Sequence, residues 1–362
     1  MLRKIFFLFA IAFLCTACNA QKPTRIWSDD SRLAYTGRVS HKTPGCARFS
    51  YPGIQIHAQF TGTSVAMVMK PGSGYYMIEI DKREAFKVHS EDNDSIVRLA
   101  EGLDEGTHRL TITSCNEGHS LKPEFHGLLL DHGADLEKRP RMYKRKMEFI
   151  GNSITCALGI EDYSADKKHS NSSTQNAYYS FAHQTARRLH AQCVLVSRSG
   201  IGIYRNTGGP KQGDKNNMQA CYPNTFFTFD ANAERWDFSR YTPDIVCINL
   251  GTNDTTYPAY DTTLLTNAFV NFVHTIRGNY PNAKIVLLSG TMRKGKLLAD
   301  LLLSLDNAVK KLQEEGETEV YRFDFTPDDG SLGYGSSMHP SLKRHTRMAD
   351  ELTPFIQEIM GW

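Results

Sequence analysis

The sequence predicts two domains in one chain, an all-β sandwich followed by an α/β domain built on a parallel sheet. With 362 residues, the chain is long enough for two domains of ordinary size. Its first third contains many short runs that alternate apolar and polar residues, which is typical of a sandwich or barrel. The remainder alternates apolar strands with amphipathic helices, which is typical of an open α/β sheet.

The first residues have the pattern of an export signal. An uninterrupted apolar stretch over residues 5–14 follows a positive start and is too short to span a bilayer comfortably. Residues 14–18, Leu-Cys-Thr-Ala-Cys, resemble a bacterial lipoprotein cleavage box. We therefore expect a signal peptide over residues 1–17 and a lipid anchor on Cys18 at a periplasmic or cell-surface membrane. The alternative is an ordinary secretory signal that is cut near Ala20. With either signal, the protein is expected to be exported.

The β-sandwich domain is predicted over residues 25–137. Turn clusters rich in glycine, proline and aspartate separate its strands, and nothing in this part suggests catalysis. A short basic segment over residues 138–141 links it to the second domain. The expected strands are residues 54–60, 64–69, 75–80, 96–99, 110–113 and 125–130.

The α/β domain is predicted over residues 144–362, with helices on both faces of the sheet. The expected strands are residues 147–150, 193–196, 244–250, 284–288 and 320–323. The expected helices are residues 176–190, 265–276, 297–315 and 341–359.

Composition argues against several classes of partner. The 42 basic residues nearly balance the 39 acidic ones, and no basic run is interleaved with aromatic residues, so no nucleic acid is expected. The six cysteines after Cys18 are irregularly spaced, without a C-x-x-C pair, and no H-E-x-x-H motif occurs. We therefore expect neither a metal nor another cofactor, and we expect a monomer. Cys193 and Cys247 fall in predicted buried strands and are expected to be core thiols.

A serine follows the first strand of the α/β domain. The apolar run that ends at Ile150 is followed by Gly151, which permits a tight turn, and then by Asn152 and Ser153. A serine on such a turn is exposed at the carboxyl end of the sheet among backbone N–H groups. That arrangement suits a nucleophile with an oxyanion hole.

Two later segments supply complementary groups. Asn253 directly follows the strand over residues 244–250, so it is expected at the same edge of the sheet, where its amide could donate to an oxyanion. His339 precedes the final helix, and imidazole is well suited to moving a proton near neutral pH. His345 is the alternative base, although it falls inside that helix.

In chain order these motifs resemble the conserved blocks of the SGNH (GDSL-type) hydrolase superfamily, with a glycine block at residues 197–202. The resemblance implies a three-layer α/β/α hydrolase domain in which Ser153 is the nucleophile and His339 is the base. It also implies an oxyanion hole made by the Ser153 N–H, the N–H of Gly200 or Gly202, and the side chain of Asn253.

The chain departs from this family pattern in two places. Asn152 stands where the family usually has aspartate, and the change is nearly isosteric. The triad acid usually lies two or three residues before the histidine, where this chain has Ser336 and Ser337. Either a backbone carbonyl orients His339, which we expect, or a distant acid such as Asp328 reaches it. The acid mainly fixes the tautomer and orientation of the ring, so a carbonyl could do part of its work.

The order of the domains narrows the resemblance to the carbohydrate esterase family 2 deacetylases, in which a jelly-roll-like domain precedes the hydrolase domain. It implies a serine esterase that removes O-acetyl groups from plant cell-wall polysaccharides such as xylan and glucomannan, through an acetyl-enzyme intermediate. Two alternatives remain open. One is a catalytically decayed glycan-binding lipoprotein, and the other is a lipase or thioesterase of the GDSL type.

Overall fold

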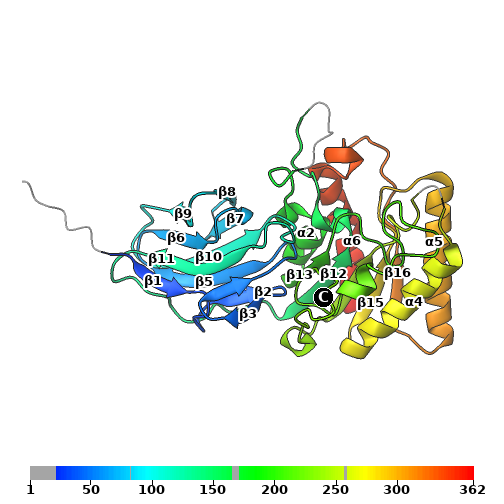
Figure 1. The fold of residues 1–362 in the computed structure, drawn as a ribbon, viewed down its shortest axis with the longest axis horizontal. Coiled ribbons are helices and arrows are strands. Elements are labelled where there is room, and N and C mark those ends of the chain that lie inside the picture. The colour runs from blue at the N-terminus through cyan, green and yellow to red at the C-terminus, as the bar shows by residue number, and fades with distance from the viewer. Residues whose placement is uncertain (1–21, 82, 165–170, 257–258) are drawn as a thin grey trace, which may run out of the picture.

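The computed structural model describes residues 22–81, 83–164, 171–256 and 259–362. The expected signal peptide over residues 1–17 and the lipid site at Cys18 lie outside the described residues. Figure 1 shows two parts arranged along the long axis, a β-sandwich at one end and a layered α/β part at the other. Both predicted fold classes are confirmed.

The β-sandwich consists of two antiparallel sheets around one apolar core. One sheet has the strand order β3-β4-β11-β6-β9, with β1 paired to β11, and the other has the order β2-β5-β10-β7-β8. The sequence patterns did not predict β1 to β4 or β8, because these strands have only three to five residues and carry few apolar side chains. The strands are β1 (Thr24–Trp27), β2 (Ala34–Thr36), β3 (Ser40–Thr43), β4 (Cys46–Arg48), β5 (Gln55–Thr61), β6 (Val65–Met69), β7 (Gly74–Ile80), β8 (Phe86–Ser90), β9 (Ile96–Ala100), β10 (Thr107–Ser114) and β11 (Glu124–Leu130).

The α/β part is built on a parallel five-stranded sheet with the order β13-β12-β14-β15-β16. Helices α2 and α6 pack on one face, and α4 and α5 pack on the other. The first strand, β12, lies between β13 and β14, which makes the carboxyl end of β12 the switch point where ligands bind in such sheets. The elements are β12 (Arg145–Gly151), α1 (Ser153–Cys156), α2 (Phe181–Arg188), β13 (Ala191–Ser197), α3 (Met218–Cys221), β14 (Ile245–Asn249), α4 (Thr262–Asn279), β15 (Lys284–Leu288), α5 (Gly295–Glu314), β16 (Val320–Phe323) and α6 (Leu342–Met360).

The helix predicted over residues 176–190 is interrupted. A 3₁₀ turn over Ala177–Tyr179 precedes α2, and Ser180 separates the two. Ser180 has a ψ of 151° and its side chain accepts a hydrogen bond from the His183 backbone N–H at 3.2 Å. This residue is therefore an N-cap, which starts a new helix and does not continue the preceding turn.

The six cysteines of the described residues are buried and form no disulfide with one another. Cys193 and Cys247 lie in β13 and β14, as expected for core thiols. Among the residues that the structure describes, no helix has the length and apolar character to cross a membrane.

The two parts are joined through a buried ion pair. Arg38 of the β-sandwich is fully buried and lies 3.6 Å from the carboxylate of Glu148 on β12. It also donates hydrogen bonds to the backbone carbonyls of Tyr222 and Asn224. Burial lowers the pKa of Arg38, but the Glu148 carboxylate outweighs that effect, so the guanidinium stays charged. The hydroxyls of Tyr222 and Tyr280 donate to the same carboxylate, and this buried network ties the sandwich to β12 of the α/β sheet.

Candidate active site

Ser153 lies at the carboxyl end of β12, on the turn into α1. Asn152 caps this helix, because its side-chain oxygen accepts a hydrogen bond from the Ile154 backbone N–H at 3.0 Å. Gly151 leaves room for the turn, since a Cβ there would lie 2.0 Å from the Thr155 hydroxyl. The N–H of Ser153, at the first helical position, has no partner within the helix. Among the described residues the Ser153 N–H has no acceptor, so the turn presents a hydroxyl and an available amide together.

His339 lies within hydrogen-bond distance of this serine. Its Nε2 is 2.7 Å from Ser153 Oγ, and its Nδ1 is 3.0 Å from the carbonyl oxygen of Ser336. A carbonyl oxygen can only accept, so Nδ1 carries the ring proton and Nε2 presents its lone pair to the serine. Of the two ways to orient His339, the structure gives the backbone carbonyl. No carboxylate of the described residues lies within hydrogen-bond distance of the ring.

The loop before His339 has an uncommon backbone conformation. Ser337 and Met338 have φ values of 52° and 61°, in the left-handed region that non-glycine residues seldom occupy. This turn brings the Ser336 carbonyl to the ring, where it also accepts from the His339 backbone N–H at 3.0 Å. The Ser336 hydroxyl donates to the buried carboxylate of Asp162 at 2.8 Å. Asp162, which the sequence patterns did not single out, thus acts on His339 through Ser336.

The aspartates shortly before His339 in the sequence form hydrogen bonds within their own loop. Asp328 accepts a hydrogen bond from the Gly330 backbone N–H at 3.0 Å. Asp329 accepts two from Ser331, from its N–H at 2.9 Å and from its hydroxyl at 2.6 Å. Neither carboxylate contacts the histidine ring, so the structure offers no support for a triad acid from this segment.

The surroundings of His339 favour the neutral ring. Burial lowers the pKa of His339 below its ordinary value of 6.5, while the backbone carbonyls of Ser336 and Ser337 and the negative charge of Glu117 oppose that shift. At neutral pH the imidazole is therefore unprotonated at Nε2. That is the state in which it can take a proton from Ser153.

Asn253 follows β14 at the same edge of the sheet as Ser153. Its Oδ1 accepts from the Thr207 hydroxyl at 2.5 Å, and its Nδ2 donates to the Ile201 carbonyl at 2.7 Å. These two bonds fix the orientation of the amide. An amide nitrogen carries two N–H donors, so one N–H of Asn253 has no acceptor among the described residues.

The backbone amides of Gly200 and Gly202 differ in what they contact. The Gly202 N–H donates to the side-chain oxygen of Asn206 at 3.0 Å. A Cβ at Gly202 would lie 1.8 Å from the Arg205 carbonyl oxygen, so this glycine permits close packing of the loop. Gly200 has a φ of 79°, and a Cβ there would meet nothing within 4 Å. Its N–H has no partner among the described residues, so the available amide of the two is that of Gly200.

A buried carboxylate, Asp254, connects the loops after β13 and β14. Its Oδ1 accepts from the N–H groups of Tyr204 and Arg205 at 2.8 and 2.9 Å. Its Oδ2 accepts from the N–H groups of Ile203 and Gly251, both at 3.1 Å. Burial raises the pKa of Asp254, and the backbone donors oppose that shift. Asp254 thereby fixes the glycine block relative to the asparagine block.

The β-sandwich contributes a second carboxylate, Glu117, from the loop after β10. Its two oxygens accept from the Ser199 N–H and hydroxyl, each at 2.6 Å. They also accept from Arg198 at 3.1 Å and from Gln175 at 3.2 Å. Glu117 therefore holds the residues directly before Gly200. Nothing in the sequence of the β-sandwich suggested a part in the site, and no local signal could have shown this contact, because the partners are 82 positions apart.

The other candidates do not reach the dyad. His345 lies in α6, fully buried, and its Nδ1 accepts from the Phe181 backbone N–H at 3.1 Å, so it is a core residue. Among the described residues, the one group of ligating side chains that could hold a metal ion lies in the β-sandwich and comprises Cys46, Glu124 and His126.

Two family models match the chain. The carbohydrate esterase 2 N-terminal model matches residues 35–140, and the GDSL-like lipase/acylhydrolase family model matches residues 149–347. The cellulase/esterase CelE of Acetivibrio thermocellus is 34% identical over 339 residues, which are 92% of this chain and 40% of that protein. This chain thus spans less than half of CelE. An acetylxylan esterase/glucomannan deacetylase of Cellvibrio japonicus is 27% identical over 358 residues, 97% of both proteins.

Solved structures match across both parts of the fold. A family two carbohydrate esterase from Clostridium thermocellum, in complex with cellohexaose, has a TM-score of 0.83 and 34% identity, covering 91% of this chain and 99% of that one. A family two carbohydrate esterase from Cellvibrio japonicus has a TM-score of 0.84 and 27% identity. The match covers 94% of this chain and 99% of that one. The chain therefore belongs to the GDSL-like lipase/acylhydrolase family and, within it, to family 2 of the carbohydrate esterases.

Proposed function

We propose that this protein is a serine esterase that removes O-acetyl groups from plant cell-wall polysaccharides through an acetyl-enzyme intermediate. The observation that carries the proposal is the contact of 2.7 Å between Ser153 Oγ and His339 Nε2, with the ring proton held on Nδ1 by a carbonyl. A glycan-binding protein with a decayed site would not need to keep this tautomer directed at a serine.

In the first half of the reaction, His339 Nε2 takes the proton of Ser153 as the oxygen attacks the acetyl carbonyl carbon. The tetrahedral intermediate then collapses. The bond between the acetyl carbon and the sugar oxygen breaks, and the Nε2 proton passes to that oxygen. In the second half, Nε2 takes a proton from water, the hydroxide attacks the acetyl-serine, and acetate leaves as Ser153 recovers its proton.

The negative charge of each tetrahedral intermediate develops on the former carbonyl oxygen. Three groups are available to donate to it: the N–H of Ser153, the N–H of Gly200 and the unpartnered N–H of Asn253. We assign the glycine role to Gly200, because the Gly202 amide already donates to Asn206. Donors fixed before the reaction stabilise the charge without reorganising, and Asp254 and Glu117 supply that fixation.

The printed activities of relatives and the surface near the site support a polysaccharide substrate. One relative is named an acetylxylan esterase/glucomannan deacetylase, and one solved relative holds cellohexaose. In this chain a cavity of about 560 Å³ between the two parts is lined by His119, Phe226 and Phe227. Arg198, two residues before Gly200, lies over the Phe227 ring at 5.4 Å. Aromatic walls of this kind can pack against sugar rings.

We further propose the domain bounds and location given by the sequence patterns. Residues 25–137 form the sandwich domain and residues 144–362 the hydrolase domain. Residues 1–17 act as a lipoprotein signal, and a lipid on Cys18 anchors the exported protein, which acts as a monomer. One relative is named an acetylxylan esterase/glucomannan deacetylase, and polymers such as xylan and glucomannan lie outside the cell.

The purified protein should release acetate from acetylated xylan and acetylated glucomannan. Ser153→Ala should reduce that release, and the hydrolysis of 4-nitrophenyl acetate, by roughly 10⁴-fold or more, as loss of a serine nucleophile does. Circular dichroism should show an unchanged fold. A Ser153→Ala variant with activity within tenfold of the wild type would remove the nucleophile assignment. Wild-type activity on 4-nitrophenyl acetate alone, with none on either glycan, would refute the substrate assignment.

The pH dependence should follow the lowered pKa of His339. Protonation of Nε2 removes the base, so kcat/KM falls as the pH drops through the pKa of the free enzyme. Because burial lowers that pKa, the half-maximal point of the acidic limb should lie below pH 6.5. The measurement is kcat/KM for 4-nitrophenyl acetate at constant ionic strength. A midpoint at or above 6.5 would contradict the neutral, carbonyl-held ring.

Glu117→Gln should test the positioning role of the sandwich domain. The variant loses the charge that orders the Ser199–Gly200 turn, so kcat should fall by about 10- to 100-fold with little change in KM. The Glu117 charge also raises the pKa of His339, so its removal should move the acidic limb to lower pH. The exposed Glu137, mutated to Gln, is the matched control and should change neither quantity. An unshifted limb with unchanged kcat would show that Glu117 only fills space.

A further inference from the structure

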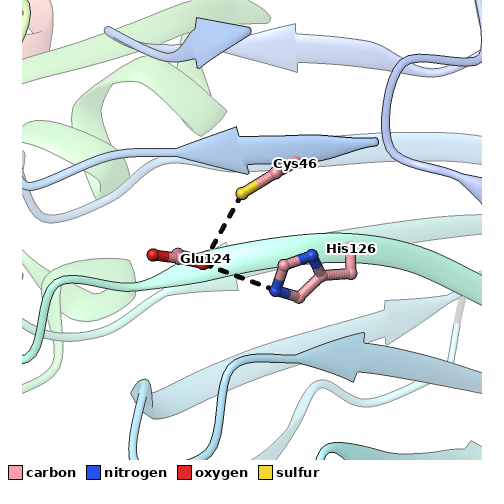
Figure 2. A group of neighbouring side chains, drawn as sticks. All are labelled: Cys46, Glu124 and His126. Atoms are coloured by element: carbon pink, nitrogen blue, oxygen red, sulfur yellow. Dashed lines mark hydrogen bonds and ion pairs between the residues drawn. The ribbon is translucent and has the colours of Figure 1, made fainter. Parts of the chain in front are cut away.

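Three potential metal ligands meet on the outer face of the β-sandwich, in the sheet that contains β4 and β11. Figure 2 shows the Cys46 thiol and the His126 ring on either side of the Glu124 carboxylate. The Cys46 sulfur is 3.6 Å from Glu124 Oε2, and His126 Nε2 is 3.5 Å from the same oxygen. All three ligating atoms lie within 4.8 Å of one another. Cys46 is 5% exposed, whereas Glu124 and His126 have side chains about one-third exposed.

The backbone brings these residues together from distant parts of the chain. Strand β4 pairs with β11 so that Arg48 lies opposite Glu124 and Ala47 lies opposite Phe125. Phe125 points into the core, so Glu124 and His126 share the outer face. The pairing of β11 with β6 shifts by one residue between Phe125 and Gly127, which places a β-bulge at His126. Bulges commonly re-aim a side chain.

Two of the three separations between the ligating atoms are close to those of a tetrahedral zinc site, and the third, between the Cys46 sulfur and the His126 ring nitrogen, is at most 4.8 Å. Bonds of about 2.3 Å to sulfur and about 2.0 Å to oxygen or nitrogen, at tetrahedral angles, put neighbouring ligand atoms roughly 3.3 to 3.5 Å apart. The two measured separations in the cluster, 3.6 and 3.5 Å, are close to that range. The sulfur and imidazole ligands suit a borderline-soft cation and not calcium or magnesium, which prefer oxygen ligands.

We propose that Cys46, Glu124 and His126 form a zinc site that fastens the short strand β4 to β11. Cys46 binds as the thiolate, with its proton passing to solvent, and water fills the fourth position. Strand β4 has three residues, and its register with β11 includes two residue pairs, so a cation shared between the two strands would reinforce this short pairing. The irregular cysteine spacing in the sequence gives no sign of this site, because Cys46 and Glu124 are 78 positions apart.

Strand β4 also carries a positively charged side chain, Arg48, which would repel a bound cation. Its guanidinium carbon lies 5.7 Å from the centre of the Phe226 ring, so this cation packs against the other part of the molecule. Without a metal, the Cys46 thiol simply donates to Glu124. The alternative to a zinc site is therefore a hydrogen-bonded cluster that binds no cation. In a zinc site, by contrast, all three side chains are needed to hold the metal.

Metal titration of the purified full chain, freed of metal by chelator, distinguishes these readings. Calorimetry with Zn²⁺ should show a single site per chain, and Co²⁺ should give a thiolate-to-metal charge-transfer absorption. Cys46→Ser should abolish that absorption, and His126→Ala should weaken zinc binding at least tenfold, in line with the loss expected on removing part of a metal site. His132→Ala removes a histidine of the same domain outside the cluster and should leave both signals intact.

Labelling of the wild-type chain covers the case in which a variant fails to fold. Zinc, but not magnesium, should slow alkylation of Cys46 by iodoacetamide, as read by peptide mass spectrometry, and should leave labelling of Cys221 unchanged. Zinc binding that survives in Cys46→Ser, or a Cys46 alkylation rate that zinc does not alter, would overturn the proposal. Esterase activity should not depend on zinc, because none of the three ligands contacts Ser153 or His339.

Discussion

The carboxylate of Asp254 is the contact on which the geometry of the active site depends most. It receives hydrogen bonds from the loop after β13 and from the loop after β14. Those loops carry Gly200 and Asn253, two of the three proposed oxyanion donors. A polar group this deeply buried is costly unless each oxygen has partners, and here each oxygen accepts two backbone N–H groups. The fixed edge of a parallel sheet places Ser153 near these loops, and Asp254 sets their relation to each other.

A neutral backbone carbonyl orients the base His339, and the nearby carboxylates act through the residues that they bind. The Ser336 carbonyl holds Nδ1 of His339, Asp162 holds Ser336, and Glu117 holds the turn before Gly200. A carbonyl stabilises an imidazolium less than a carboxylate in direct contact would, which agrees with the lowered pKa of the ring. Glu117 comes from the β-sandwich, so the two domains build one site, and the buried Arg38–Glu148 pair holds them in register.

Local sequence patterns predicted much of the fold and of the active site. The strands before Ser153 and Asn253 are short, mainly apolar runs that end in turn residues, so both their type and the polar groups after them could be inferred. Short strands such as β3 could not, because Ser40–Thr43 has no apolar alternation. The break at Ser180 was hidden, because the apolar side chains on either side of it continue the helical spacing, although serine is favoured at helix N-caps. The roles of Glu117, Asp162 and Asp254 depend on long-range packing, and spacing along the chain carries no signal for such contacts.

The central claim is a carbonyl-oriented Ser153–His339 dyad that faces an oxyanion hole with Gly200 as its glycine donor. A crystal structure of the protein inactivated by a dialkyl fluorophosphate would test it most directly, because the phosphoryl oxygen occupies the position of the oxyanion. The account predicts phosphorus on Ser153 Oγ, with that oxygen about 2.7 to 3.1 Å from the nitrogens of Ser153, Gly200 and the Asn253 side chain. His339 Nδ1 should remain on the Ser336 carbonyl. An adduct on another residue, an oxygen bound to the Gly202 amide, or a carboxylate at Nδ1 would contradict it.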